Sequence, residues 1–292
     1  MYLMRYLIKT ALVIIFVATA TITAGTSRKQ PGYPSLPGVV WRNLEPGLEY
    51  AAFPFPRASK VGDSLIRVLR IDPKRFELRL LNASAPEHVR SLTAKEWCQQ
   101  NRLVAAINAS MYQENRRTSV SLMRTKAHTN NPRLSKDVAI LAFDRQNPDV
   151  PLVKIIDRQC EDFDAWKSKY GTLVQSIRMI SCKGKNVWSQ QPQKWSASAI
   201  GIDNKGRVLF IHVRSPFSTY DLINILIDLP IGISRAMYLE GGKEAQLYVQ
   251  SGDQAYEFTG IYETGFDGNN IHDRAWSIPN VIGIVKRNKP LK

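Results

Sequence analysis

Residues 208–242 have the sequence VLFIHVRSPFSTYDLINILIDLPIGISRAMYLEGG, and this segment decides the fold. Its first six residues are mostly branched or aromatic, which is typical of a strand. Ser218 and Asp221 then predict the start of a helix, in which apolar side chains recur at helical spacing until Pro230. A second apolar strand is expected at residues 236–240. The segment therefore predicts the order strand, helix, strand.

A second segment has the same order. Strands are expected at residues 76–81 and 103–108, and a capping box of Thr93 and Glu96 predicts a helix between them, to about residue 101. If both connections are right-handed crossovers, the two strands of each unit run parallel and end at the same sheet edge. Ligands of open α/β sheets bind at that edge. The residues expected there are Asn108, Ser110, His212, Arg214, Glu240, Gly241 and Gly242.

Other strand-like runs outnumber the helices. They lie at residues 48–53, 64–71, 138–143, 152–156, 173–180, 197–203, 246–250 and 281–285, and a short third helix is expected at 162–169. The predicted class is α/β, with α+β as the alternative. We expect a strand-rich mixed sheet with a few crossover helices, in a single domain over residues 39–288.

The N-terminus has the pattern of an export signal. Arg5 and Lys9 precede an apolar run over residues 11–24, and Ala18 and Ala20 provide small side chains for a signal peptidase. Residues 1–24 are therefore interpreted as a signal peptide or an uncleaved membrane anchor, and the proline-containing residues 25–38 as a linker. The predicted location is the periplasm, with membrane contact only through an uncleaved N-terminal segment.

Charge narrows the choice of partner. The 292 residues include 40 Lys and Arg against 25 Asp and Glu, a net charge of +15 spread along the chain. Such a surface favours anionic partners. Export and the lack of an RNA-binding, helix-turn-helix or zinc-finger signature argue against nucleic acid. A phosphorylated or otherwise anionic glycan is the expected partner.

The sequence lacks the motifs of metal enzymes, serine hydrolases and nucleotide-binding proteins. The four His have no metal-ligand spacing, and the chain has no Gly-x-Ser-x-Gly elbow and no phosphate-binding glycine loop. We therefore expect no metal and no cofactor. Of the three Cys, Cys160 and Cys182 could form a disulfide that leaves Cys98 buried, but three unpaired core thiols are an equal alternative.

Two charged residues stand out at the predicted strand ends. Glu240 precedes Gly241 and Gly242, so its carboxylate would lie at the rim of a pocket, although an ordinary Gly-Gly turn with a solvated glutamate is slightly favoured by the sequence alone. Arg178 alternates with apolar residues in a strand. Its guanidinium therefore either holds an anionic ligand such as phosphate or forms a structural ion pair.

An ordered set of motifs gives a family resemblance. Residues 106–112 are AINASMY, residues 198–203 are SAIGID, and residues 236–242 are AMYLEGG, followed by Gln-Leu-Tyr at 246–248. This set resembles the phosphodiester glycosidase family over about residues 60–286. The family commonly has Asn-Gly-Gly-Phe-Phe at the first motif, Leu-Asp-Gly-Gly followed by serines at the third, and an arginine just before the Ala-Ile-Gly strand. The chain resembles a divergent bacterial branch.

The resemblance implies an exported hydrolase that cleaves a sugar-1-phosphodiester in an anionic envelope glycan. Glu240 would provide the carboxylate that stabilises or attacks the anomeric carbon. Arg178, with His212 and Arg214, would hold the phosphate. Asn108, Ser110 and the amides of Gly241 and Gly242 would orient the sugar. The altered motifs also allow a non-catalytic envelope protein that binds anionic polysaccharide or takes part in exopolysaccharide assembly. A glycoside hydrolase acting on a substrate without phosphate is a third possibility.

Overall fold

The segment quoted above folds into strand, helix and strand in the computed structural model, which describes residues 39–88, 90–264 and 274–291. β13 (Val208–Phe217), α2 (Thr219–Asp228) and β14 (Ile233–Gly241) follow one another along the chain. β12 (Trp195–Asp203) lies between the two strands and pairs antiparallel with both. β13 and β14 therefore run parallel, as predicted, but are separated by a third strand.

The second predicted unit has the same arrangement. β4 (Phe76–Asn82) and β5 (Ala105–Asn108) are connected through α1 (Ala94–Asn101), and β17 (Asn280–Lys286) pairs antiparallel with both strands. Both helices begin at their predicted caps. The Thr93 hydroxyl accepts from the backbone N–H of Glu96 at 3.2 Å, and the Ser218 hydroxyl accepts from that of Asp221 at 3.1 Å. Each cap stabilises its helix by about 1 kcal/mol.

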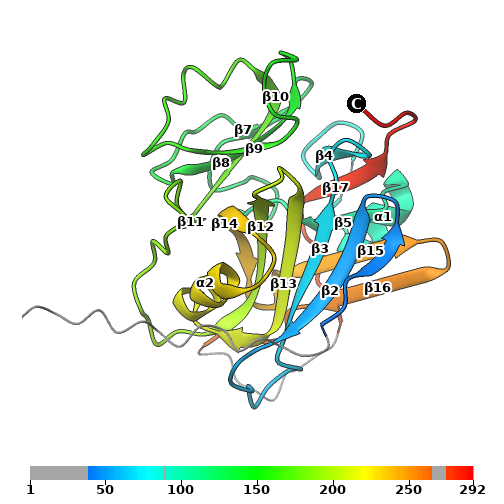
Figure 1. Cartoon of the computed structure of the whole chain (residues 1–292). Helices are drawn as coiled ribbons and strands as arrows, with labels where there is room; N and C mark the ends of the chain where they lie inside the picture. Colours follow the sequence, from blue (N-terminus) through cyan, green and yellow to red (C-terminus); the bar gives the residue numbers. More distant parts are fainter. Residues whose placement is uncertain (1–38, 89, 265–273, 292) are drawn as a thin grey trace, which may run out of the picture. The chain divides into compact units, whose positions relative to one another are not determined.

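The strands form three sheets rather than the single mixed sheet expected from the sequence (Figure 1). The first has, in spatial order, β1 (Arg42–Glu45), β2 (Leu48–Pro54), β3 (Leu65–Ile71), β13, β12, β14 and β11 (Arg178–Ile180). The second has β7 (Thr129–Asn131), β6 (Met123–Arg124), β10 (Tyr170–Ser176), β8 (Ala139–Arg145) and β9 (Lys154–Asp157). The third has β16 (Gln254–Thr259), β15 (Gln246–Ser251), β5, β17 and β4.

The predicted class is only partly right. The protein is strand-rich, as expected, but its described residues contain only two α-helices, so the fold is mostly β. Every pairing between the named strands is antiparallel. Residues 162–169 form turns instead of a helix, and the run at 173–180 is divided between β10 and β11 in two sheets. β1, β6, β7 and β16 were not predicted.

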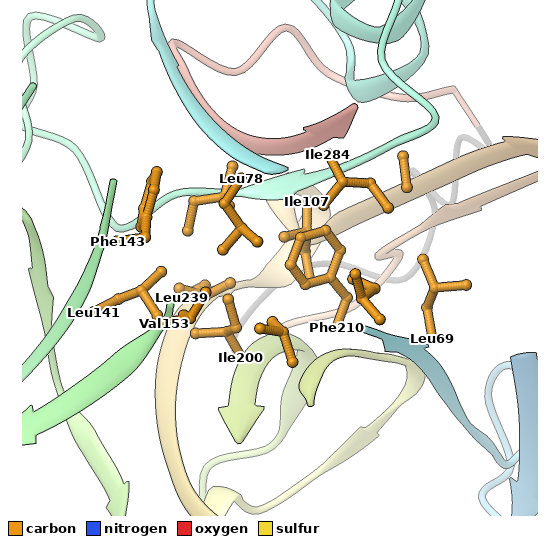
Figure 2. Close-up of a cluster of buried hydrophobic side chains, with 14 of the residues drawn as sticks. Leu69, Leu78, Ile107, Leu141, Phe143, Val153, Ile200, Phe210, Leu239 and Ile284 are labelled. Carbon is orange, nitrogen blue, oxygen red and sulfur yellow. The ribbon is translucent and has the colours of Figure 1, made fainter. Parts of the chain in front are cut away.

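One apolar core joins the three sheets. Figure 2 shows Leu69 and Phe210 of the first sheet, Leu141 of the second and Ile107 of the third among the side chains of this cluster, and all four residues are fully buried. Burial of each such side chain contributes about 1.5–3 kcal/mol. A second cluster packs the apolar face of α2 against the first sheet. The core thereby holds β14, and the turn at its end, in a rigid frame.

The structure settles the pairing of the cysteines. Cys160 and Cys182 form a disulfide, and Cys98 is free and buried, so that burial raises the pKa of its thiol. The predicted signal peptide and linker lie outside the described residues. Within the described part of the chain, no helix combines the length and apolar character needed to cross a bilayer.

Candidate functional site

Three glutamates surround the turn at the end of β14. Glu240 and Gly241 end the strand, and Gly242–Glu244 forms a short 3-10 helix (η1). Gly242 has a φ of +66°, which glycine adopts without steric strain. A Cβ atom added to Gly242 would lie 2.7 Å from Glu263 Oε2 and 3.5 Å from Glu244 Oε2. Glu263 is distant in sequence and reaches the turn because its backbone pairs with Trp195 through an isolated bridge. The turn is therefore surrounded by Glu240, Glu244 and Glu263.

Protein atoms crowd the Glu240 carboxylate, although part of the residue remains accessible. This desolvation, with smaller contributions from the charges of Glu244 and Glu263, raises the pKa of Glu240 to about 8. Desolvation and Glu263 also raise the pKa of Glu244. Glu240 is therefore mostly protonated at neutral pH and can donate a proton, which is the state that a general acid requires.

Two tyrosines add polar groups to the glutamates. The Tyr112 hydroxyl donates to Glu244 Oε1 at 3.3 Å, and burial together with the charge of Glu244 raises the pKa of Tyr112 to about 12. Tyr238 is buried in the strand before the turn, where burial and the charge of Glu240 raise the pKa of its hydroxyl. Both hydroxyls stay protonated and can act as hydrogen-bond donors near the carboxylates.

Asn108 holds the turn through hydrogen bonds of its side-chain amide. Its Oδ1 accepts from the backbone N–H of Gln246 at 2.7 Å and from the Ser198 hydroxyl at 3.3 Å, and its Nδ2 donates to the backbone carbonyl of Glu244 at 2.7 Å. Only 2% of the residue is exposed. The Asn108 amide thus holds the backbone of Glu244 and Gln246 at the turn, and its expected contact with the sugar stays a prediction.

His212 also supports the turn rather than facing a ligand. It is fully buried, and its Nε2 lies 3.2 Å from the backbone carbonyl of Ala245, which also accepts from Gly260 N–H at 2.7 Å. Burial, with Arg67 nearby, lowers the pKa of His212 to about 3. A neutral, inaccessible imidazole does not supply a charge for phosphate, and this part of the prediction is corrected to a positioning role.

Ser110 and Arg214 lie at other places around the site. The buried Ser110 hydroxyl donates to the backbone carbonyl of Gln175 at 3.1 Å, so it joins the first motif to β10. Arg214 Nη1 lies 3.3 Å from the carbonyl and the hydroxyl oxygen of Thr259, and Arg214 lines a surface pocket with Lys95 and Arg274. A contact of Arg214 with an anionic ligand therefore stays a prediction.

Arg178 has a protein carboxylate as its partner. Its Nη1 donates to both oxygens of Asp157 at 2.8 Å, and its Nη2 donates to Gln159 Oε1 at 2.7 Å. Burial favours the neutral form of Asp157, but the hydrogen bonds from Arg178 and from two backbone N–H groups outweigh it and lower the pKa of Asp157. This geometry favours the structural ion pair over the expected phosphate contact.

The amide of Gly241 is likewise occupied. It donates to Glu240 Oε1 at 3.1 Å, within the same dipeptide. A Cβ atom at Gly241 would lie 2.0 Å from the Tyr238 hydroxyl oxygen, so the glycine permits a close packing of the strand end. The Gly241 amide therefore orients the Glu240 carboxyl group, and the expected roles of Gly241 and Gly242 in orienting the sugar stay predictions.

Glu244, Tyr112 and Glu263 complete the site but were not predicted from the sequence. Glu244 has a usable signal, because it stands two positions after the glycine pair and two positions before Gln246, where β15 begins. Tyr112 was part of the first motif but received no role. Glu263 has no such signal, since only the folded chain brings it to Gly242.

One described group has the ligand types of a metal site, with Asp157, Cys160 and Cys182 offering atoms within 4.8 Å of one another. The two sulfurs are bonded to each other, and Arg178 pairs with the carboxylate. The same carboxylate also accepts from the backbone N–H of Cys182 at 3.0 Å, so this group of described residues does not offer an open set of metal ligands.

Comparison with solved structures supports this fold. The catalytic domain of zebrafish N-acetylglucosamine-1-phosphodiester α-N-acetylglucosaminidase, auto-inhibited by its pro-peptide, matches with a TM-score of 0.61 at 14% identity, over 84% of this chain and 86% of that one. A hypothetical protein from Synechocystis matches with a TM-score of 0.56 at 14% identity, over 87% of this chain and 64% of that one. At such identities the likeness shows the fold alone.

No curated protein sequence matches the chain significantly. The family model for phosphodiester glycosidase, however, matches residues 101–285, which is more than half of the sequence. The matched region contains Asn108, His212, Glu240 and Glu244, and therefore most of the turn and its supports. The chain belongs to the phosphodiester glycosidase family.

Proposed function

We propose that the protein is an exported hydrolase that cleaves the bond between a sugar and a phosphodiester in an anionic envelope glycan. The observation that carries the proposal is the pair of glutamates on the Gly241–Gly242 turn, in which Glu240 is protonated at neutral pH beside Glu244. Glycoside hydrolysis needs two carboxyl groups with different pKa values at the scissile bond. Family membership supports the same bond type.

The two carboxyl groups divide the reaction between them. Glu240 gives its proton to the oxygen that bridges the anomeric carbon and phosphorus, and the carbon–oxygen bond breaks so that the phosphate monoester leaves with that oxygen. Glu244, once ionised, stabilises the positive charge that develops at the anomeric carbon. Water adds its hydroxyl to this carbon and returns one proton to the carboxyl pair, which restores the starting state.

The predicted export of the protein and its positive net charge support a substrate in the cell envelope. The N-terminal pattern predicts export, and a disulfide such as Cys160–Cys182 is typical of an oxidising compartment. The net charge of +15 would draw in a negatively charged polysaccharide. These features support, in particular, a periplasmic exopolysaccharide as substrate.

A non-catalytic role in binding anionic polysaccharide is the second candidate. It is favoured by the substitutions in the third motif, where Glu240 replaces the usual aspartate and Lys243 and Glu244 replace the usual serines. Under this alternative the glutamates and tyrosines would hydrogen-bond sugar hydroxyls without turnover.

A substrate panel distinguishes the two functions. The purified protein should release free sugar and a phosphate monoester from an N-acetylglucosamine α-1-phosphodiester, as followed by chromatography and ³¹P NMR. Other sugar-1-phosphodiesters, and neutral aryl glycosides, complete the panel. Binding of anionic polysaccharide in calorimetry without release of any sugar would reject hydrolysis and support the binding role.

Asn108→Ala tests whether the support of the turn matters for catalysis. The substitution leaves the buried N–H of Gln246 without its acceptor, which costs about 1–3 kcal/mol of stability, and frees Glu244 to shift. We expect kcat to fall about 10²-fold, since small displacements of reacting groups have effects of this size. The pH profile of kcat/KM should also change its acidic limb, whereas the exposed Asn43→Ala control should change neither quantity. An unaltered profile would contradict the positioning role.

A further inference from the structure

Arg116 and Trp276 lie together at the edge of the glutamate cluster. The guanidinium carbon of Arg116 lies over the Trp276 ring, 6.0 Å from its centroid, and both residues are exposed, Trp276 to 36%. Lys243 Nζ lies 5.4 Å from the same ring, but Lys243 is buried and already engaged in an interaction within the chain. Arg116 is therefore the accessible cation of this group.

A tightly bonded turn holds Arg116 in place. Its φ of +54° is uncommon for a residue other than glycine, and such strained positions are kept only where the surroundings determine them. The N–H of Arg116 donates to the carbonyl of Gln113 at 2.8 Å, and the N–H of Gln113 donates to the carbonyl of Thr118 at 2.8 Å. Asn115 Oδ1 accepts from two further backbone N–H groups of the turn. The turn therefore fixes the backbone position from which the Arg116 side chain extends.

Both residues are connected to the Gly241–Gly242 turn. The Trp276 carbonyl accepts from Gln246 Nε2 at 2.6 Å, and the N–H of Gln246 is held by Asn108. Tyr112, four residues before Arg116, bonds Glu244. Burial raises the pKa of Glu244, and the charge of Arg116 opposes this increase, so the two side chains are within electrostatic reach of each other.

We infer that Arg116, supported by the Trp276 ring, binds the phosphate of the substrate, an inference that rests on the proposed function. A phosphodiester whose bridging oxygen lies beside the protonated Glu240 comes close to the carboxyl groups of Glu244 and Glu263, whose ionised forms repel it, and it requires a cation on the side of the leaving group. The planar fork of an arginine matches two phosphate oxygens. At 6.0 Å from the centroid, the Trp276 ring attracts the guanidinium as a cation–π partner and favours its position beside the site. The assignment gives the phosphate a partner in place of Arg178 and His212.

Arg116→Met tests this subsite in the full-length protein. For an N-acetylglucosamine α-1-phosphodiester, KM should rise at least tenfold, and the loss in kcat/KM should exceed the loss for a neutral aryl N-acetylglucosaminide at least tenfold. Arg116→Lys should restore part of the affinity. Lys205→Met removes the same charge from the exposed turn between β12 and β13, at the end of β12 that is far from Trp195. This control should change neither KM nor kcat/KM for either substrate. Equal losses on both substrates, or an effect of Lys205→Met as large as that of Arg116→Met, would overturn the assignment.

Binding separates this inference from the proposed reaction. Calorimetry with N-acetylglucosamine 1-phosphate should show at least tenfold weaker binding by Arg116→Met than by the unmodified protein, and the difference should shrink as salt is added. If this holds but no phosphodiester is cleaved, the phosphate subsite stands and the hydrolase is rejected. If phosphodiesters are cleaved but the two proteins bind the sugar phosphate equally, the hydrolase stands and Arg116 is excluded. No binding by the unmodified protein also overturns the subsite.

Discussion

Glu240→Gln is expected to lower kcat/KM for a sugar-1-phosphodiester about 10³-fold at neutral pH, since proton transfer by a positioned acid contributes 10²- to 10⁴-fold. Glutamine has the shape of the protonated glutamate and, like it, no charge. The substitution therefore removes the proton that the bridging oxygen receives but preserves the packing of the turn. Steady-state kinetics on folded protein, verified by circular dichroism, measure the effect.

The pH dependence identifies Glu240 more directly than the rate alone. In the unmodified protein kcat/KM should decline as the pH rises through about 8, because Glu240 then loses its proton. The acidic limb should lie above the ordinary range of a glutamate, because the pKa of Glu244 is raised. Since the two groups interact, both apparent values belong to the pair.

Stability gives an independent check on the same carboxyl group. A pKa raised from 4.5 to about 8 by folding means that Glu240 contributes stability below pH 4.5, which is lost progressively as the pH rises through 8. The free energy of unfolding of Glu240→Gln, from urea titrations, should lack this decline. Glu77→Gln, at a half-buried residue of β4 that pairs with Arg79 near the surface, is the control and should retain it. Parallel declines in Glu240→Gln and the unmodified protein would contradict our assignment.

Arg178→Met should mainly destabilise the protein. The substitution leaves the carboxylate of Asp157, whose side chain is only 2% exposed, without its cation. Breaking a buried ion pair from one side typically costs 3–5 kcal/mol. We therefore expect the free energy of unfolding to fall by about 3 kcal/mol and Tm by roughly 6–12 °C. The KM of the folded enzyme should change less than threefold.

The double variant Arg178→Met with Asp157→Leu separates a structural role from phosphate binding. Because it removes both charges, it should recover much of the stability lost in the single variant. The lowered pKa of Asp157 also means that this pair contributes stability above the unfolded pKa, which is lost as the pH falls through the native one. A large rise in KM with unchanged stability would instead restore Arg178 to the phosphate site.

Local patterns predicted the parts of this protein that depend on local physics. The strand, helix and strand of residues 208–242 follow from apolar periodicity and from the Ser218 cap, both of which act within a few residues. The parallel direction of β13 and β14 follows from the helical connection between them. The motif order also led to the correct family, with Asn108 and Glu240 among the candidate residues.

The local patterns did not predict that a third strand lies between the two parallel strands of each unit. β12 separates β13 from β14, and β17 separates β4 from β5, because the free energy of pairing depends on cross-strand packing between distant segments. For this reason one predicted mixed sheet became three antiparallel ones. The run at residues 173–180 shows the same effect, since its two halves pair with β8 and β14 in different sheets.

Residue identity alone determined which side chains can carry charge, donate a proton or permit a left-handed turn. Tertiary structure decided what each of them does, because a side chain acquires its role from neighbours that are distant in sequence. It gave Arg178 a carboxylate partner in Asp157 and buried His212 as a neutral support. It also brought Glu263 to Gly242 and Arg116 to Trp276. Desolvation and charge at one turn, which no local pattern contains, then shifted Glu240 to a protonated state.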